Sequence, residues 1–187
     1  MMGSSGFLLR PNAMMVHEQG QCTMNKIIAF STVALGIGLA WPGPAIAQTA
    51  KDLVGTWTNV ANVNIRQDGT RVNVFGPNGK GLAIFDSNGR FAIVNVNPDT
   101  PKFAANNRAQ GTPTENKAAM EGGIALFGTY TVGPDKGITM KVEGSTYPNW
   151  TGTEQKRTVV SFTGDELKWT LPASIGGTAE VTWKRIK

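Results

Sequence analysis

The sequence predicts an all-β domain, an antiparallel barrel or sandwich of about nine short strands, and two observations support this. From Leu53 onward, apolar residues recur with a period of two, which is the alternation of a half-buried strand. Turn signals such as Asp68-Gly69 and Asn88-Gly89 recur at the spacing of hairpins. Many short strands joined by hairpins are typical of antiparallel barrels and sandwiches.

The expected strands follow one another as a meander with short connections. Most are separated by turns rich in Gly, Asn, Asp and Pro, which break strands. The strands are predicted at 53–65, 71–75, 82–86, 90–97, 124–132, 138–143, 155–162, 167–171 and 179–186.

Four residues in the first and last strands are expected to close the sheet. Gly55 lets the backbone enter the first strand tightly, because it has no Cβ, and Trp57 puts a large apolar side chain on one face. Alternation places Trp183 and Arg185 on one face of the last strand. If these two strands pair, the sheet closes and Arg185 can lie over an indole ring.

One segment, 98–122, is too long and too polar to be a hairpin loop. It contains a capping box from Thr112 to Glu115 with Pro113 at the first helical position, and Gly122 stops the helix. The sequence therefore predicts one short helix in a crossover. Three roles are compatible with this helix: it seals one end of the barrel, it flanks a pocket mouth, or it serves as a plain crossover connection.

The N-terminal region carries the pattern of a secretory signal peptide at 24–47. A basic start at Lys26 precedes an apolar run of 13 residues, 27–39, and a small-x-small site ends at Ala47. The alternative is an uncleaved anchor, but a membrane span needs about 20 apolar residues. Residues 1–23 are then an upstream extension or follow a misassigned start, and the barrel domain occupies 51–187. This organisation predicts a periplasmic or secreted protein.

The composition of the exported part excludes several kinds of chemistry. His17 and Cys22, the only residues of their types, both precede the signal peptide. Residues 48–187 therefore offer no disulfide, no His-based metal site, no Ser-His-Asp triad and no Cys nucleophile. Their 16 Lys and Arg against 12 Asp and Glu give a net charge of +4, and these charges are scattered. Nucleic acid requires a clustered basic patch, so no nucleic-acid partner is expected.

Several motifs, in order, resemble those of the bacterial and fungal lipocalin-like domain family across 51–187. They are Leu53-Val54-Gly55-Thr56-Trp57, Gly76-Pro77-Asn78-Gly79-Lys80-Gly81, Pro101-Lys102-Phe103-Ala104-Ala105-Asn106-Asn107-Arg108, Gly111-Thr112-Pro113-Thr114-Glu115-Asn116-Lys117, Val142-Glu143-Gly144-Ser145-Thr146-Tyr147-Pro148-Asn149-Trp150 and Thr182-Trp183-Lys184-Arg185. This resemblance implies a small up-and-down lipocalin-like β-barrel of about eight to nine strands with an internal cavity. It implies little about activity, because a fold does not fix function.

The strand pattern also suggests which side chains line the barrel. The more apolar faces carry Trp57, Leu82, Ile84, Phe91, Ile93, Ile124, Leu126, Tyr130, Met140, Val142, Leu167, Trp169 and Val181. Asn59, Asn95 and Asn97 share faces with such residues, so these amides either bind a ligand or satisfy loop backbone. Alternation alone does not decide which face points inward.

Ligand-binding residues are predicted in or next to the two long connections, 98–122 and 144–154. The five candidates are Asn107, Arg108, Tyr147, Trp150 and Arg157, which combine aromatic walls, an amide and two cations near one open end. Each has a structural alternative: a turn shaped by Asn107, a plug of one barrel end formed by the 147–150 segment, and a cross-strand ion pair between Arg157 and Glu143.

Three functions are compatible with these features. We favour an exported barrel that binds a small, partly apolar molecule with an anionic or carbonyl end, without a cofactor and without stable membrane insertion once the signal is cleaved. An isomerase or cyclase would need Glu143, Tyr147 or a group oriented by Arg157 for proton transfer. A structural envelope protein would have a barrel filled by side chains. Neither the ligand's identity nor the oligomeric state follows from the sequence.

Overall fold

A computed structural model describes residues 49–187, and the predicted signal peptide and upstream extension lie outside this range. The strands are β1 (Gly55–Ile65), β2 (Arg71–Asn73), β3 (Lys80–Phe85), β4 (Arg90–Val96), β5 (Gly123–Val132), β6 (Ile138–Ser145), β7 (Glu154–Phe162), β8 (Glu166–Pro172) and β9 (Thr178–Arg185). The helices are α1 (Ala50–Leu53), α2 (Pro113–Glu121) and the 3-10 turns η1 (Arg108–Gln110) and η2 (Pro148–Trp150).

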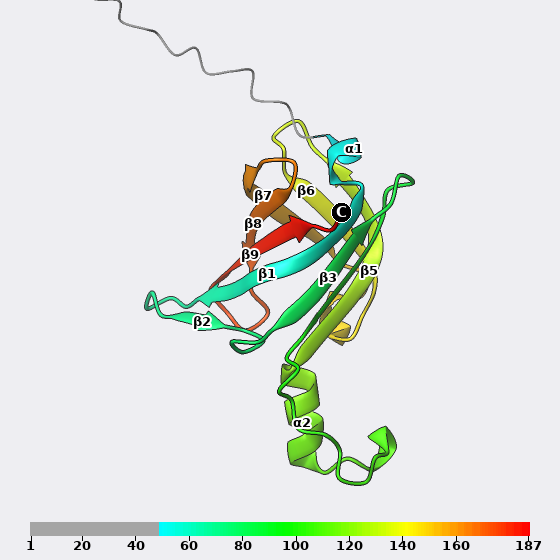
Figure 1. Ribbon diagram of the computed structural model, residues 1–187, viewed down its shortest axis with the longest axis vertical. Helices are drawn as coiled ribbons and strands as arrows, with labels where there is room; N and C mark the ends of the chain where they lie inside the picture. The colour runs from blue at the N-terminus through cyan, green and yellow to red at the C-terminus, as the bar shows by residue number, and fades with distance from the viewer. Residues whose placement is uncertain (1–48) are drawn as a thin grey trace, which may run out of the picture. The chain divides into compact units, whose positions relative to one another are not determined.

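Eight of these strands form a closed antiparallel barrel (Figure 1). Strands β3 to β8 each pair with the next strand in sequence, while β1 pairs with both β3 and β9 and closes the ring. The short β2 is an extra strand that pairs only with the end of β1, at 63–65. The prediction of an all-β up-and-down barrel of eight to nine strands with a helix in a crossover is therefore confirmed, and the sandwich alternative is wrong.

The β1–β9 seam joins the two ends of the domain. Trp57 is the register partner of Arg185, whose guanidinium lies 4.1 Å from the centre of the indole ring. A Cβ on Gly55 would lie 2.6 Å from the Arg185 Nη1 atom, and Gly55 has a φ of +136°. Glycine at this position therefore makes room for the arginine and allows a backbone conformation that other residues rarely adopt.

The short helix α1 lies at one end of the barrel and ends at Leu53, the residue at which the sequence pattern places the start of the first strand (Figure 1). The Asp52 carboxylate stabilises the start of α1 by accepting hydrogen bonds from the backbone N–H and the hydroxyl of Thr49. Leu53, the last residue of α1, is fully buried, and its carbonyl accepts a hydrogen bond of 2.9 Å from the indole of Trp57. The polar edge of this large buried ring is therefore satisfied.

The inward face of β3 is the opposite of the predicted one. Ala83 and Phe85 are buried, whereas Leu82 and Ile84 are exposed by 40% and 42%. Cross-strand partners share a face, and Phe85 lies opposite the buried Phe91. The prediction failed because the 82–85 segment is apolar on both faces, so alternation gave no signal.

Helix α2 and the rest of the 98–122 crossover lie at the end of the barrel opposite α1 (Figure 1). The predicted capping box is present: the Thr112 hydroxyl accepts from the Glu115 backbone N–H, and the Glu115 carboxylate accepts from the Thr112 backbone N–H. The same carboxylate also accepts a hydrogen bond from Ala104, which ties the preceding loop to the helix.

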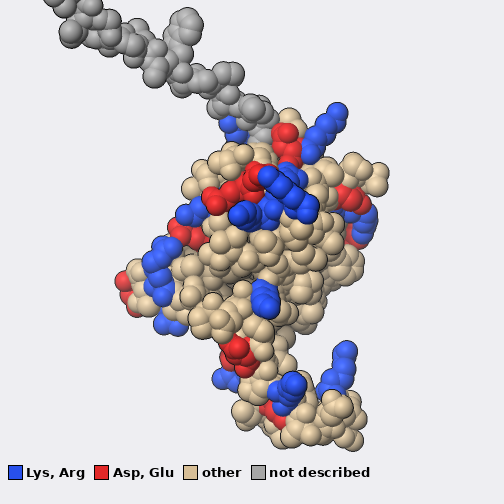
Figure 2. All heavy atoms as spheres, in the orientation of Figure 1, with Lys and Arg blue, Asp and Glu red and all other residues tan. Residues whose placement is uncertain are grey.

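The outer surface shows acidic and basic side chains interspersed around the barrel, with much of the visible sheet occupied by neither (Figure 2). Several opposite charges pair, as in the 2.7 Å contact between Arg90 and Glu143. Among residues 49–187, no helix is long and apolar enough to cross a membrane.

Candidate ligand-binding site

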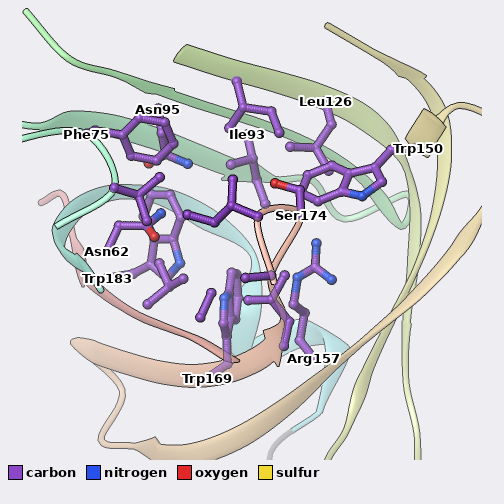
Figure 3. Close-up of a pocket in the computed structure, with 17 residues that line it drawn as sticks. Asn62, Phe75, Ile93, Asn95, Leu126, Trp150, Arg157, Trp169, Ser174 and Trp183 are labelled. Atoms are coloured by element: carbon purple, nitrogen blue, oxygen red, sulfur yellow. The ribbon is translucent and has the colours of Figure 1, made fainter. Parts of the chain in front are cut away.

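A cavity of about 80 Å³ lies inside the barrel in the half toward α2 (Figure 3). Its lining comes from β1, β4, β5, β7, β8 and β9, from η2, and from the loops that follow β2 and β8. Its largest apolar side chains are Phe75, Ile93, Leu126, Trp150, Trp169 and Trp183. The barrel is therefore not completely filled by its own side chains, which removes the main support for the filled-barrel hypothesis.

Aromatic rings form much of the cavity wall. Trp169 and Trp183 are almost fully buried, and their ring centres lie 5.8 Å apart with a tilt of 57° between the planes. Trp150 comes from η2 on the other side of the cavity (Figure 3), where it packs against the core. Such rings give a flat, rigid apolar surface with few rotatable bonds, which suits contact with another ring.

Arg157 places a positive charge in this apolar setting. It lies on β7 opposite the fully buried Ile138, so its side chain points inward, and only 3% of the residue is exposed. Within residues 49–187, no carboxylate pairs with it, and its guanidinium donates a single hydrogen bond, to Gln155. Burial lowers the pKa of Arg157 to about 10, so the group remains charged at neutral pH.

A chain of hydrogen bonds holds this guanidinium in place. Its Nη2 atom donates to Oε1 of Gln155 over 2.7 Å, and Nε2 of Gln155 donates to the Thr153 hydroxyl. That hydroxyl donates to the carbonyl of Trp150 over 2.7 Å. Arginine carries five N–H donors, so this arrangement orients the group while leaving most of its donors available to a ligand in the cavity.

Neutral polar groups face Arg157 from the opposite side of the cavity (Figure 3). Asn95 and Trp183 are 4% and 1% exposed, yet Oδ1 of Asn95 and Nε1 of Trp183 have no hydrogen-bond partner in the described chain. Gly81 makes room for the Asn95 amide, because a Cβ there would lie 2.1 Å from Oδ1. Both atoms are enclosed by neighbouring side chains and do not border the open space of the cavity.

A hollow of about 200 Å³ adjoins the cavity at the α2 end of the barrel. Met120 and Glu121 of α2, Tyr147 before η2 and Ile175 after β8 contribute to its walls. The rings of Tyr147 and Trp150 meet edge to face with centres 5.7 Å apart. The hollow and the cavity share five lining residues, including Phe75 and Ile175, so we describe the hollow as the mouth of the cavity.

The structure brings three of the five predicted ligand-binding residues together. Trp150 and Arg157 line the cavity, and Tyr147 lines its mouth. Asn107 and Arg108 are exposed, line neither the cavity nor the hollow at its mouth, and lie in the crossover loop that precedes α2. The expected convergence of all five is therefore wrong: Oδ1 of Asn107 accepts from the Ala109 backbone N–H and caps η1.

Glu143 does not occupy the position that either of its predicted roles requires. It lies on the outside of β6 and pairs with Arg90, so the predicted cross-strand pair with Arg157 is wrong. An acid–base role for Glu143 inside the barrel is wrong for the same reason. Residues 49–187 also contain no group of three or more His, Cys, Asp or Glu side chains placed to bind a metal.

The sequence interpretation missed several lining residues. Phe75 follows the short β2 and is 7% exposed, and Ser174 and Ile175 form the turn between β8 and β9. Ile175 is 63% exposed at the mouth. A large apolar residue is unusual in a turn such as Ser-Ile-Gly-Gly, and this feature of the sequence indicates that Ile175 contributes to a binding surface.

A closed antiparallel barrel with an apolar cavity and an inward cation defines a class of small barrels that have room for a ligand. The lipocalin-like domain family matches residues 54–186, and the chain belongs to this family.

One relative is the 4'-hydroxy-3'-methoxypropiophenone carrier protein ppsC of Aspergillus oryzae. It is 36% identical over 104 residues, which cover 49% of this chain and 92% of the relative. Among solved structures, a redesigned β-barrel covers 76% of this chain and 98% of its own, with 16% identity and a TM-score of 0.40. A designed fluorescence-activating β-barrel covers 73% and 96%, with 14% identity and a TM-score of 0.39.

Proposed function

We propose that this protein is a carrier that holds a small, partly apolar molecule in its barrel and binds the anionic or carbonyl end of that molecule with Arg157. The observation that carries the proposal is the buried guanidinium, which has one hydrogen bond and no carboxylate partner in the described chain. A buried charge without a partner is costly, and a ligand oxygen would offset that cost with charge-assisted hydrogen bonds.

The size of the cavity limits the ligand. The inner cavity of about 80 Å³ and the mouth of about 200 Å³ are together smaller than the pockets of about 300–1,000 Å³ that hold drug-sized ligands. A single ring with a short substituent fits this space better than a long lipid chain. The relative's name identifies its cargo as a propiophenone, an aromatic ketone, which supports the same size and chemistry here.

Two variants and mass spectrometry test this function. The purified protein would be denatured and its small-molecule content compared between wild type, Arg157→Met and Arg108→Met. Arg108 is the matched control, because it is an exposed arginine outside the cavity. We expect one molecule per barrel in the wild type and the control and none in Arg157→Met. The same bound molecule in equal amount in all three proteins would contradict the proposal.

Titration with cinnamate, an aromatic carboxylate, gives a second readout if the protein purifies empty. We expect Arg157→Met to weaken cinnamate binding by at least about a hundredfold, as expected when a charge-assisted pair is lost. Arg108→Met should bind as the wild type does. Absence of measurable binding of cinnamate to the wild type, together with no copurifying molecule, would overturn the carrier function.

We also propose that the barrel is exported after cleavage behind Ala47. The support is the apolar run at 27–39 followed by Ala45-Ile46-Ala47. N-terminal sequencing of protein from the periplasm or medium should begin at Gln48. A mature chain that still carries 27–39 would contradict export with cleavage.

A further inference from the structure

We propose that the outer face of β3, β4 and β5 is a dimer interface, at which two copies of this chain pack face to face. This inference does not depend on the proposed function, because it concerns the outside of the barrel. The inner face of the same strands supplies Ile93 and Leu126 to the cavity wall. The interface and the cavity are therefore separated by one sheet.

The strand register makes five exposed apolar side chains neighbours on this face. Leu82 is the register partner of Val94, and in the next row Ala92 lies between Ile84 and Phe127. Cross-strand partners share a face of the sheet, so these side chains form one surface. We call it the outer apolar patch, and its five members, each 40–49% exposed, are Leu82, Ile84, Val94, Val96 and Phe127.

Charged side chains border the outer apolar patch. Lys80, the register partner of Val96, lies at one end, and the ion pair between Arg90 and Glu143 lies at the other. In Figure 2 the surface over β3 and β5 is largely free of acidic and basic side chains. Anionic membranes and nucleic acids are bound by clustered cations. A border with one cation and one neutralised pair therefore favours another apolar protein surface as the partner.

The shape of the patch suits a second copy of the same surface. The Phe127 ring leans over the neighbouring strand, where a Cβ on Gly144 would lie 2.6 Å from the ring carbon Cε1. Beside this ring, the small side chain of Ala92 leaves a recess between Phe127 and Ile84. A two-fold axis brings the projection of each copy to the recess of the other, which is the geometry of a symmetric dimer.

The size of the patch also fits a dimer. Its five side chains expose on the order of 400 Å² of apolar surface, which lies within the range of about 300–600 Å² that often marks an interaction site. A standard interface buries about 800 Å² on each partner, and the interface of a homodimer is about 65% apolar. The patch therefore supplies most of the apolar area, and Thr56 and Thr58 of the adjoining β1 supply part of a polar rim.

Analytical ultracentrifugation over a range of protein concentrations tests this interface. We expect the wild type to show a reversible monomer–dimer equilibrium with a Kd in the micromolar range. Val94→Lys places a charge on the central strand of the patch and should weaken association by at least about a hundredfold. The matched control is Val160→Lys, because Val160 is 58% exposed on β7, outside the patch. It should dimerise as the wild type does.

Cross-linking through cysteine gives a second measurement that does not depend on a disrupted surface. Cys22 is the only cysteine of the chain, so Cys22→Ser provides a background without thiols. In this background we expect a short bis-maleimide to join two copies of Val94→Cys, because sheets that pack face to face lie about 10 Å apart. Under the same conditions Val160→Cys should remain a monomer on a denaturing gel.

Three results would overturn the proposal. The first is a wild type that sediments as a monomer at every concentration. The second is a dimer that survives equally in Val94→Lys and Val160→Lys, or equal cross-linking at both cysteines, which would place the interface elsewhere. The third is a monomer that floats with phosphatidylglycerol vesicles and loses this binding in Val94→Lys, which would show that the patch binds a membrane. Each of these leaves the carrier function intact, because that function is tested by bound ligand and not by association.

Discussion

Two arginines of the barrel, Arg185 at the β1–β9 seam and Arg157 facing inward from β7, have different surroundings. Arg185, at the closed end, donates to the backbone carbonyls of Gly164, Val54 and Asp52, and it stacks on Trp57. Arg157, beside the cavity, donates one hydrogen bond, to Gln155, and is 3% exposed. The same residue type therefore has its donors satisfied by the fold in one place and left available in the other.

The two ends of the barrel repeat this difference. At the α1 end, the indole of Trp57 donates to Leu53, and the Tyr130 hydroxyl donates to the carbonyl of Asp86 over 3.0 Å. In the cavity half, Asn95 and Trp183 each keep a buried atom without a partner. We infer that the α1 end stabilises the fold and that the cavity half is built for binding.

The largest expected effect is on stability at the α1 end. Trp57→Ala removes a fully buried ring and should lower the free energy of unfolding by about 3–5 kcal/mol. Trp150→Ala, in the cavity half, should cost less, because Trp150 is only partly buried. Guanidinium chloride denaturation measures both. A near-neutral Trp57→Ala would show that the seam is not part of the core.

The second largest effect on stability is expected at Arg185, whose guanidinium donates to three backbone carbonyls. Arg185→Met should lower the free energy of unfolding by about 2–3 kcal/mol, since three carbonyls lose charge-assisted hydrogen bonds. Arg185→Lys should recover only part of this, because lysine cannot reproduce the planar fork of donors. Neither variant should change the affinity for cinnamate at temperatures where the protein is folded. A change in cinnamate affinity without a loss of stability would contradict the structural role given to Arg185.

The sequence was sufficient to predict the barrel because its local signals agree with the fold. The Asn88-Gly89 turn joins β3 to β4, and the capping box at Thr112 starts α2. The buried face of β3 was not predictable, because Leu82 and Phe85 are both apolar and only the register with β4 decides which one is buried. Tertiary pairing, not strand propensity, set that face.

The binding site was less predictable than the fold. The place of Asn107 in a long polar loop favours a binding role, but such loops also use asparagine to cap turns, as Asn107 does for η1. The strand segment 154–157 is polar at every position, so alternation could not show that Arg157 alone is deeply buried. The unpartnered state of Asn95 and Trp183 depends on neighbours from other strands, which no local pattern reports.

A smaller effect is expected from the residue that orients Arg157. Gln155→Leu removes the one hydrogen bond of the guanidinium and should weaken cinnamate binding by about tenfold, less than Arg157→Met does. Lys156→Met is the control on the same strand, because Lys156 points outward to Asp135 over 2.6 Å. Titration of both variants measures the difference. Equal losses in the two would show that Gln155 does not position the arginine.

The smallest effect is local and depends on pH. Backbone hydrogen bonds from Ala104 and Thr112 lower the pKa of Glu115 below its usual value. A carboxyl with a lowered pKa stabilises the folded state above its ordinary pKa of about 4.5, and this contribution is lost as the pH falls through the folded value. Amide NMR signals of Ala104 and Thr112 should therefore shift in acid. Glu115→Gln should remove this titration.

The central claim is that Arg157 binds a ligand and does not stabilise the fold. The most direct test is chemical denaturation of the wild type and of Arg157→Met, each with and without cinnamate. Without cinnamate, the account predicts that the variant is as stable as the wild type or more stable by about 1–4 kcal/mol, since an unpaired buried charge has been removed. With saturating cinnamate, the wild type should gain stability in proportion to ligand binding, and the variant should not. A variant that is less stable without ligand and gains as much from cinnamate as the wild type would contradict the account.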